Sequence, residues 1–236
     1  MNAETTARHF SRDIAECWAG QLGARLLGVY LIGSLTHGGF SERYSDIDMG
    51  LVTENGVTPD EIDAMRAYAR DLSPALAPKL SLFWSDRNFT MGRFPPLDRL
   101  DYLDHAETLI ERERVQPARP SLGDVRIYLR GQPLEAWRAQ IVRVTAPAAL
   151  DDTTRKPYIR ALLYPARFVY SWHTGLMASN DDAVAFLRQH RPDGLDLDLV
   201  DRALTCRLEA RDPDALFAER GKLPEQLAAC ERLAAN

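Results

Sequence analysis

The chain has 236 residues, enough for one large domain or two small ones, and a chain of this length folds without disulfides or structural metals. Hydrophobic residues make up 45% of it and charged residues 27%, which excludes disordered, collagen-like and coiled-coil proteins. The net charge of −5 argues against nucleic-acid binding, and none of the lysines (Lys79, Lys156 and Lys222) stands in a Walker phosphate-binding loop.

The N-terminal third predicts a helix followed by strands. Apolar residues recur every three or four positions over residues 4–23, which predicts an amphipathic helix. The nearly continuous apolar run of residues 26–32 predicts a buried strand. A loop rich in glycine and hydroxyl residues then leads into residues 47–52, where alternating apolar side chains predict a second strand.

A second helix and a third strand follow. Thr58 and Glu61 flank Pro59 in the pattern of a capping box, which predicts that a helix begins there. Residues 79–84 predict the third strand, and beyond Pro95 the strand signals fade. The remaining chain predicts helices over residues 97–103, 123–128, 134–144, 158–172, 181–189, 199–208 and 224–233.

These elements predict an α/β (α+β) protein with two domains. We expect a small mixed sheet with helices in residues 1–146 and a helical bundle in residues 147–236. The sequence Thr145-Ala146-Pro147 marks the change of character between them and is the predicted linker.

Two carboxylates lie one residue apart in the second predicted strand. Side chains alternate between the faces of a strand, so Asp46 and Asp48 project to one side, about 6.6 Å apart along the chain. Their mutual repulsion is roughly 2–3 kcal/mol at an effective dielectric near 20 unless a cation lies between them. Paired oxygen ligands of this kind suit Mg²⁺, which shares its coordination sphere with water and substrate phosphates.

The end of the first predicted strand supplies groups suited to a phosphate. Gly33 permits a close approach of backbone N–H groups to a ligand, and Ser34 adds a hydroxyl donor. Together with the paired carboxylates they predict a nucleotide–metal site.

The motif Leu31-Ile32-Gly33-Ser34, followed after eleven residues by Asp46-Ile47-Asp48, resembles the polymerase-β-like nucleotidyltransferase superfamily. The resemblance implies ATP as a substrate and Mg²⁺ held by Asp46 and Asp48. It also implies that Gly33, Ser34 and Ser45 lie at the nucleotide.

The second half is similar to the C-terminal helical domain of aminoglycoside adenylyltransferases, which have an arginine on this helix, a Thr-Gly at its end and a lysine soon after. Here Arg167 and Thr174-Gly175 match, which implies that Arg167 contacts the triphosphate. The lysine position holds Asn180, so that contact is lost or is taken over by Lys156 or Arg155.

The third predicted strand departs from the superfamily pattern. A third carboxylate is usual there, but Ser81 occupies its position. Asp86, Asp101 and Asp104 are the candidates to replace it, and each has the alternative of being a solvated charge. A base that takes the hydroxyl proton is useful in nucleotidyl transfer, and Asp101 is the one we select.

The resemblance implies an enzyme that transfers AMP from ATP to a hydroxyl of a small molecule, with an aminoglycoside as the family's acceptor. The alternatives are a catalytically degenerate nucleotide-binding module, which Ser81 and Asn180 favour, and an adenylyltransferase acting on a protein. We expect a cytoplasmic protein, because its first thirty residues are dotted with charges and its cysteines show no disulfide or metal spacing. We expect it to bind neither nucleic acid nor membranes, because its net charge is −5 and its most apolar later stretch, residues 159–177, carries Arg160 and Arg167.

Overall fold

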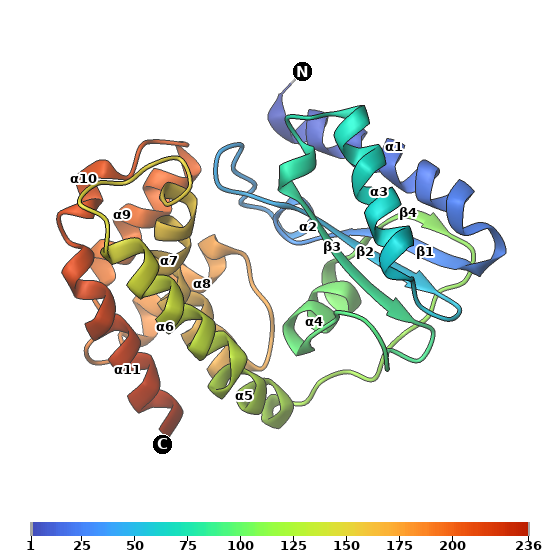
Figure 1. The fold of residues 1–236 in the computed structure, drawn as a ribbon. Coiled ribbons are helices and arrows are strands. Elements are labelled where there is room, and N and C mark those ends of the chain that lie inside the picture. The colour runs from blue at the N-terminus through green and yellow to red at the C-terminus, as the bar shows by residue number, and fades with distance from the viewer. Residues whose placement is uncertain (1, 236) are drawn as a thin grey trace. The chain divides into compact units, whose positions relative to one another are not determined.

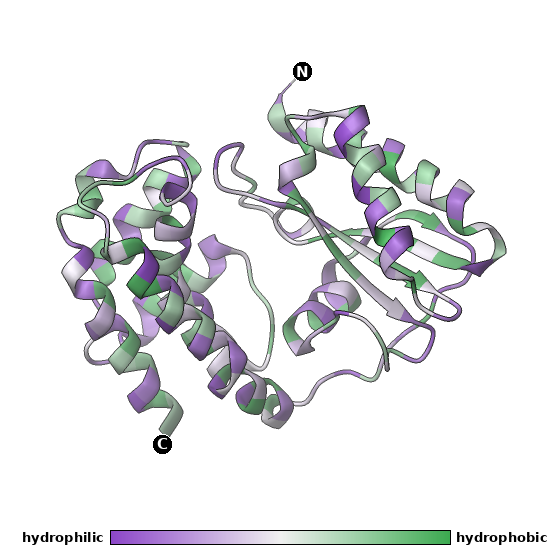
Figure 2. Ribbon diagram, in the orientation of Figure 1, coloured by the Kyte–Doolittle hydropathy of each residue, from purple (hydrophilic) through white to green (hydrophobic). Residues whose placement is uncertain are grey.

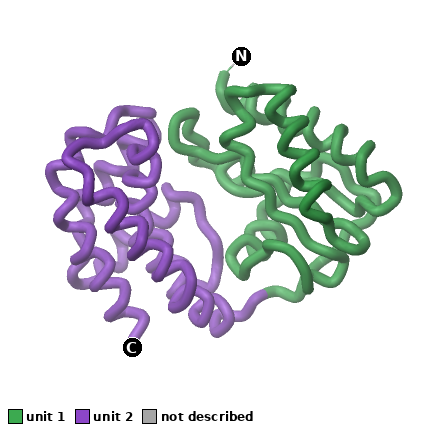
Figure 3. Tube along the Cα trace, viewed as in Figure 1, with its two compact units in different colours: residues 1–119 green, residues 120–236 purple. Residues whose placement is uncertain are grey.

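A computed structural model describes residues 2–235 and divides the chain into two compact units, residues 1–119 and 120–236 (Figure 3). The elements of the first are α1 (Ala3–Leu22), η1 (Gly23–Arg25), β1 (Leu26–Ile32), α2 (Ser34–His37), β2 (Ile47–Thr53), α3 (Pro59–Leu72), η2 (Ala77–Lys79), β3 (Leu80–Asp86), α4 (Pro96–His105) and β4 (Glu107–Glu111). Those of the second are α5 (Leu122–Arg130), α6 (Gln132–Thr145), α7 (Arg155–Thr174), α8 (Asn180–His190), α9 (Leu197–Leu208), α10 (Asp214–Phe217), η3 (Arg220–Lys222) and α11 (Leu223–Ala235).

The first unit is built on a four-stranded mixed sheet with the strand order β3-β2-β1-β4. β1 pairs antiparallel with both β2 and β4, whereas β2 and β3 run parallel. The helices α1 and α3 lie on one face of this sheet and α4 lies on the other (Figure 1). The predicted mixed-sheet α/β class is therefore confirmed.

Both faces of the sheet are covered, so β1 is buried along its whole length. On one face the side chains of Ile47, Met49 and Leu51 pack with residues of α1 and α3, and on the other an aromatic cluster includes Tyr30, Phe94 and Tyr102. Figure 2 shows hydrophobic and hydrophilic residues alternating along α1 and α3, as helices that cover a sheet require.

Most predicted elements of the first unit are confirmed, the capping box of Thr58 and Glu61 among them. The prediction that strands end before Pro95 was wrong, because Glu107–Glu111 forms β4. This strand lies at the edge of the sheet, is five residues long and carries a charge at each end. Such short, charged edge strands give little alternation to recognise.

The second unit consists of helices that pack around α7, whose contacts include α5, α6, α8, α9 and α11. The division of the chain at Arg119–Pro120 differs from the predicted boundary after residue 146. The reason is that α5 and α6 pack against α7, so Thr145-Ala146-Pro147 covers the end of α6 and the start of a loop inside the helical unit. Among the described helices, none is long and apolar enough to span a membrane.

Candidate nucleotide-binding site

The turn after β1 brings the backbone close to the second carboxylate. Gly33 adopts φ 75° and ψ −155°, a conformation that is accessible to glycine and costly for other residues. A Cβ built at this position would lie 2.4 Å from Oδ2 of Asp48. The glycine therefore leaves the space in which the Asp48 carboxylate lies, at the junction of β1 and α2.

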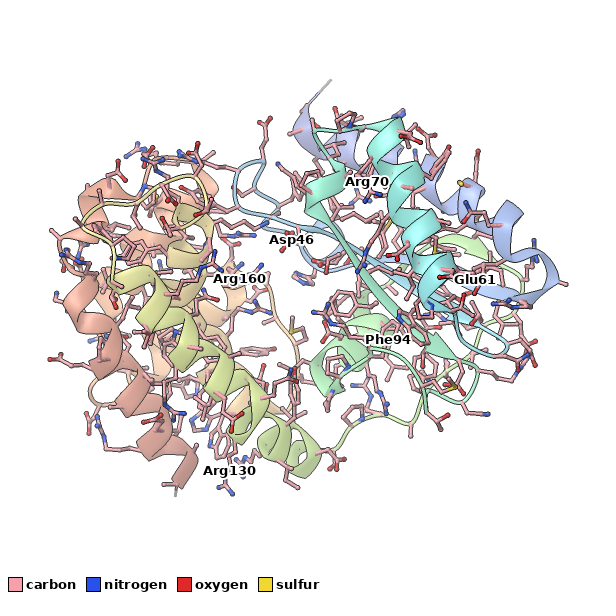
Figure 4. The ribbon with its side chains drawn as sticks, in the orientation of Figure 1. Asp46, Glu61, Arg70, Phe94, Arg130 and Arg160 are labelled. Carbon is pink, nitrogen blue, oxygen red and sulfur yellow. The ribbon has the colours of Figure 1, made fainter. Side chains whose placement is uncertain are left out.

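The two predicted metal-binding carboxylates lie at the start of β2, where Figure 4 labels Asp46. Both side chains are partly exposed, whereas Ile47 and Met49 beside them are completely buried. This alternation confirms that Asp46 and Asp48 face the same side of the strand, as the sequence predicted.

Ser34 and Ser45 are brought together across the loop of residues 35–44. The Ser34 hydroxyl donates to the Ser45 hydroxyl at 3.0 Å, and Ser45 also accepts from the backbone N–H of Ser41 at 2.9 Å. Ser45 is buried and Ser34 is partly exposed. Ser45 thus braces the loop, and Ser34 is the hydroxyl at the surface of this turn.

The parallel register of β2 and β3 sets Ser81 beside Asp48. On β3 the neighbour of Asp48 is therefore a hydroxyl and not a carboxylate. Among residues 2–235 no group of three histidine, cysteine, aspartate or glutamate side chains is arranged to hold a metal ion. Asp46 and Asp48 are the carboxylate donors that this turn offers.

Asp86 does not reach this turn. It is the last residue of β3, where it pairs with Thr53, so it lies five residues and about 17 Å along the strands from the Asp48–Ser81 pair. Burial raises the pKa of Asp86, but hydrogen bonds from Met91, Thr90 and Asn88 outweigh burial and hold that pKa below its usual value. Its carboxylate organises the loop after β3.

Asp101 and Asp104 lie on α4 and differ in their surroundings. Asp101 is 3% exposed, and its Oδ2 accepts the backbone N–H of Gly33 at 2.6 Å. Its Oδ1 lies 3.8 Å from Nε2 of His37, the last residue of α2. Asp104 forms an ion pair with Arg119. Of the two, Asp101 is the carboxylate that touches the Gly33–Ser34 turn.

The aromatic side chains behind α4 are neutral. The rings of Tyr30 and Tyr102 pack edge to face at 5.0 Å in the cluster on that side of the sheet. Burial raises the pKa of both phenols above the ordinary value, so neither is charged near neutral pH. Because Tyr102 is a residue of α4, this cluster packs α4 against the sheet.

In the second unit Arg167 lies half-buried on α7, and its Nη2 contacts Sδ of Met177 at 3.9 Å. The helix ends at Thr174, and Gly175 follows in the left-handed conformation, so the Thr-Gly pair terminates α7. Asn180 is the first residue of α8, after the N-cap Ser179.

The two residues predicted to replace the missing lysine differ in their partners. Arg155 is ion-paired with Asp152, Asp212 and Asp214, which leaves its guanidinium fully engaged within the helical unit. The neighbouring Lys156 is partly exposed. Its exposure alone does not distinguish it from Arg155 as the replacement for the lysine of the family.

Sequence reasoning missed the contacts that hold α2 in place. The Gly33 amide and Asp101 are 68 residues apart, and Arg8 of α1 donates to the carbonyl oxygen of Leu35 in α2. The side chain of His37 is 10% exposed beside Asp101, and no sequence motif marks this histidine. No local pattern marks pairs this distant along the chain.

No protein-family profile matches the sequence, and no curated protein matches it. The structure is similar to that of spectinomycin adenyltransferase AAD(9) from Enterococcus faecialis, whose crystal structure was determined with ATP and spectinomycin. The TM-score is 0.66 with 14% sequence identity, and the match covers 92% of this chain and 97% of that chain. The chain therefore has a nucleotidyltransferase fold, as the glycine–serine and paired-aspartate motifs predicted.

Proposed function

We propose that the chain is a Mg²⁺-dependent nucleotidyltransferase that transfers AMP from ATP to a hydroxyl of a small molecule. The observation that carries this proposal is the close approach of Gly33 to Asp48, with Asp46 on the same side of β2. A glycine-lined turn that makes room for a carboxylate next to a second, partly exposed carboxylate is suited to a nucleotide and its cation.

The donor set fits a divalent cation. Asp46 and Asp48 offer hard oxygen ligands, and their position at the surface of the turn leaves room for the water and phosphate oxygens that Mg²⁺ prefers. When bound, Mg²⁺ neutralises the charge that develops on the phosphate oxygens during transfer. In its absence the two carboxylates repel each other.

The remaining residues of the turn bind and orient the nucleotide. The Ser34 hydroxyl exchanges its bond to Ser45 for one to a phosphate oxygen, and the buried Ser45 keeps the loop behind it in place. Arg167 binds the triphosphate by analogy with the adenylyltransferases. In the reaction the acceptor oxygen forms a bond to the α-phosphorus of ATP. The bond between the α-phosphorus and the oxygen that bridges it to the β-phosphorus breaks, and pyrophosphate leaves with the electron pair of that bond.

The acceptor hydroxyl also loses a proton. Asp101 is the carboxylate of α4 that touches the turn, and two roles are open to it: accepting that proton or holding the Gly33 amide. A polyhydroxylated amine such as an aminoglycoside is our choice of acceptor, because the structurally similar enzyme was crystallised with spectinomycin.

Ser81 beside Asp48 favours one alternative, a nucleotide-binding module without transferase activity. Incubation of the protein with Mg²⁺, α-labelled ATP and a pool of aminoglycosides and other polyhydroxylated metabolites separates the two. We expect label on one acceptor, release of pyrophosphate, and loss of both in Asp46→Asn. ATP binding without any labelled product would favour the module instead.

The part played by Arg167 has its own test. We expect Arg167→Ala to weaken Mg-ATP binding, measured by calorimetry, because a guanidinium that binds phosphate is lost. The matched control is Arg188→Ala, which removes an arginine of the same unit that is ion-paired with Asp201 at the surface. Equal ATP affinity in the two variants would mean that Arg167 does not contact the nucleotide.

A further inference from the structure

The buried carboxylate of Asp101 joins two elements that are distant in the sequence. Its Oδ2 accepts the N–H of Gly33, the residue at the N-terminal end of α2, and its Oδ1 lies 3.8 Å from His37 at the other end. One side chain of α4 thus faces both ends of the short helix that carries Ser34.

The helix α2 does not hold itself in place. It has four residues, far fewer than an isolated helix needs, and Gly38 and Gly39 follow it with positive φ. Its other anchors are Arg8, which donates to the Leu35 carbonyl, and Ser45, which accepts from Ser34. The position of Ser34 relative to Asp48 therefore depends on contacts from outside the segment.

The burial of Asp101 bears on which of its two open roles it performs. A general base must reach the proton that it accepts, directly or through one water. Asp101 is 3% exposed, Oδ2 is engaged by the Gly33 amide, and Oδ1 is buried as well. An ionised carboxylate in this position is well suited to hold a backbone amide, since charge-assisted hydrogen bonds are the stronger ones.

We propose that Asp101 is a positioning residue, which fixes the Gly33–His37 segment and so holds Ser34 at the turn where Gly33 approaches Asp48, and that it is not the proton acceptor. The effect of this role on catalysis rests on the proposed nucleotidyl transfer. The anchoring of the segment by Asp101 is a property of the protein without ligand and does not depend on that proposal. It also means that the Gly33 N–H holds the fold together and is not available to a phosphate.

Two substitutions at position 101 separate the roles. Asparagine keeps an oxygen that can accept the Gly33 N–H, whereas alanine removes it. A base cannot be replaced by either residue. An anchoring role therefore predicts rescue by Asp101→Asn and loss in Asp101→Ala, while a base predicts equal loss of transfer in both.

The first readout is amide hydrogen exchange of the full-length apoprotein. We expect Asp101→Ala to speed exchange across residues 33–37 by about tenfold or more, and Asp101→Asn to change it much less. The matched control is Asp86→Asn, which alters another buried carboxylate that accepts backbone N–H groups in the same unit. Unchanged exchange at residues 33–37 in Asp101→Ala would overturn the anchor.

The second readout is Mg-ATP affinity together with transfer of label from ATP. We expect the Kd for Mg-ATP to rise about tenfold in Asp101→Ala and to stay within about threefold in Asp101→Asn, with transfer following affinity. Abolished transfer in both variants with unaltered ATP binding would make Asp101 the base. A wild-type protein that binds no ATP would refute the proposed function, whereas the exchange result would still decide the anchor.

Discussion

A Cβ on Gly33 would lie 2.4 Å from Oδ2 of Asp48, so the residue that follows β1 leaves the space that the carboxylate of the second residue of β2 occupies. Real Cβ atoms do not approach oxygen so closely. The position of the Asp48 carboxylate therefore requires a residue without a side chain at position 33. This contact explains why the glycine–serine motif and the paired aspartates occur together in the sequence.

Gly33→Ala follows directly from this contact. We expect a loss of about 1–3 kcal/mol in the free energy of unfolding from backbone strain alone, with displacement of Asp48 and loss of stabilisation by Mg-ATP in addition. Denaturant titration and thermal shift with and without Mg-ATP measure the two effects.

The control for this variant is Gly23→Ala. Gly23 has a similar backbone conformation, φ 54° and ψ −135°, but nothing lies within 4 Å of a Cβ there. It should show the strain without the loss of Mg-ATP stabilisation. A Gly33→Ala protein that Mg-ATP stabilises as well as the wild type would contradict the site.

Asp46→Asn and Asp48→Asn test the paired carboxylates. Each substitution removes like-charge repulsion, so we expect the apoprotein to be as stable as the wild type or more so, while stabilisation by Mg-ATP disappears. Thermal unfolding with EDTA and with Mg-ATP is the measurement, and the exposed Asp71→Asn is the control for a simple change of net charge. A clear loss of apoprotein stability would mean that the pair has a structural role.

Ser81→Asp introduces a third carboxylate next to Asp48. Like charges on neighbouring strands are destabilising, so we expect the apoprotein to lose about 0.2–1 kcal/mol. Added Mg²⁺ should recover that loss, because three carboxylates bind the cation better than two. The uncharged variant Ser81→Asn should show neither effect. If Mg²⁺ raises the melting temperature of Ser81→Asp no more than that of Ser81→Asn, position 81 does not face the cation.

Local patterns predicted much of the sheet and its carboxylates. The buried run of β1, the capping box at Thr58 and the alternation around Asp46 and Asp48 each follow from residues close together in the chain. The pairing of Ser81 with Asp48, in contrast, follows from the register of β2 and β3 and not from a local pattern.

What the sequence did not reveal depends on distant contacts. The edge strand β4 is defined by its pairing with β1, and the unit boundary at Arg119 by the packing of α5 and α6 on α7. The bond between Asp101 and Gly33 spans 68 residues. In each case a contact with residues far away in the sequence, and not the local pattern of residue types, determines the structure.

Asp86 gives a prediction for pH. Hydrogen bonds from Met91, Thr90 and Asn88 outweigh the effect of burial and lower the pKa of this carboxyl in the folded protein, whereas in the unfolded chain it is about 3.9. A lowered folded-state pKa contributes stability that is fully present above the unfolded value and is lost as the pH falls through the folded one. Asp86→Asn lacks this contribution and should unfold more easily by about 1–3 kcal/mol near neutral pH.

The difference in unfolding free energy between the wild type and Asp86→Asn should therefore be constant above about pH 5 and shrink below about pH 4. Urea titrations between pH 3 and 7 measure it. The control is Asp13→Asn, which makes the same chemical change at an exposed position of α1. A difference that stays the same down to pH 3 would mean that protonation of Asp86 does not change the free energy of unfolding. The loop after β3 would then be held by the shape of the Asp86 side chain and by hydrogen bonds that do not need its charge.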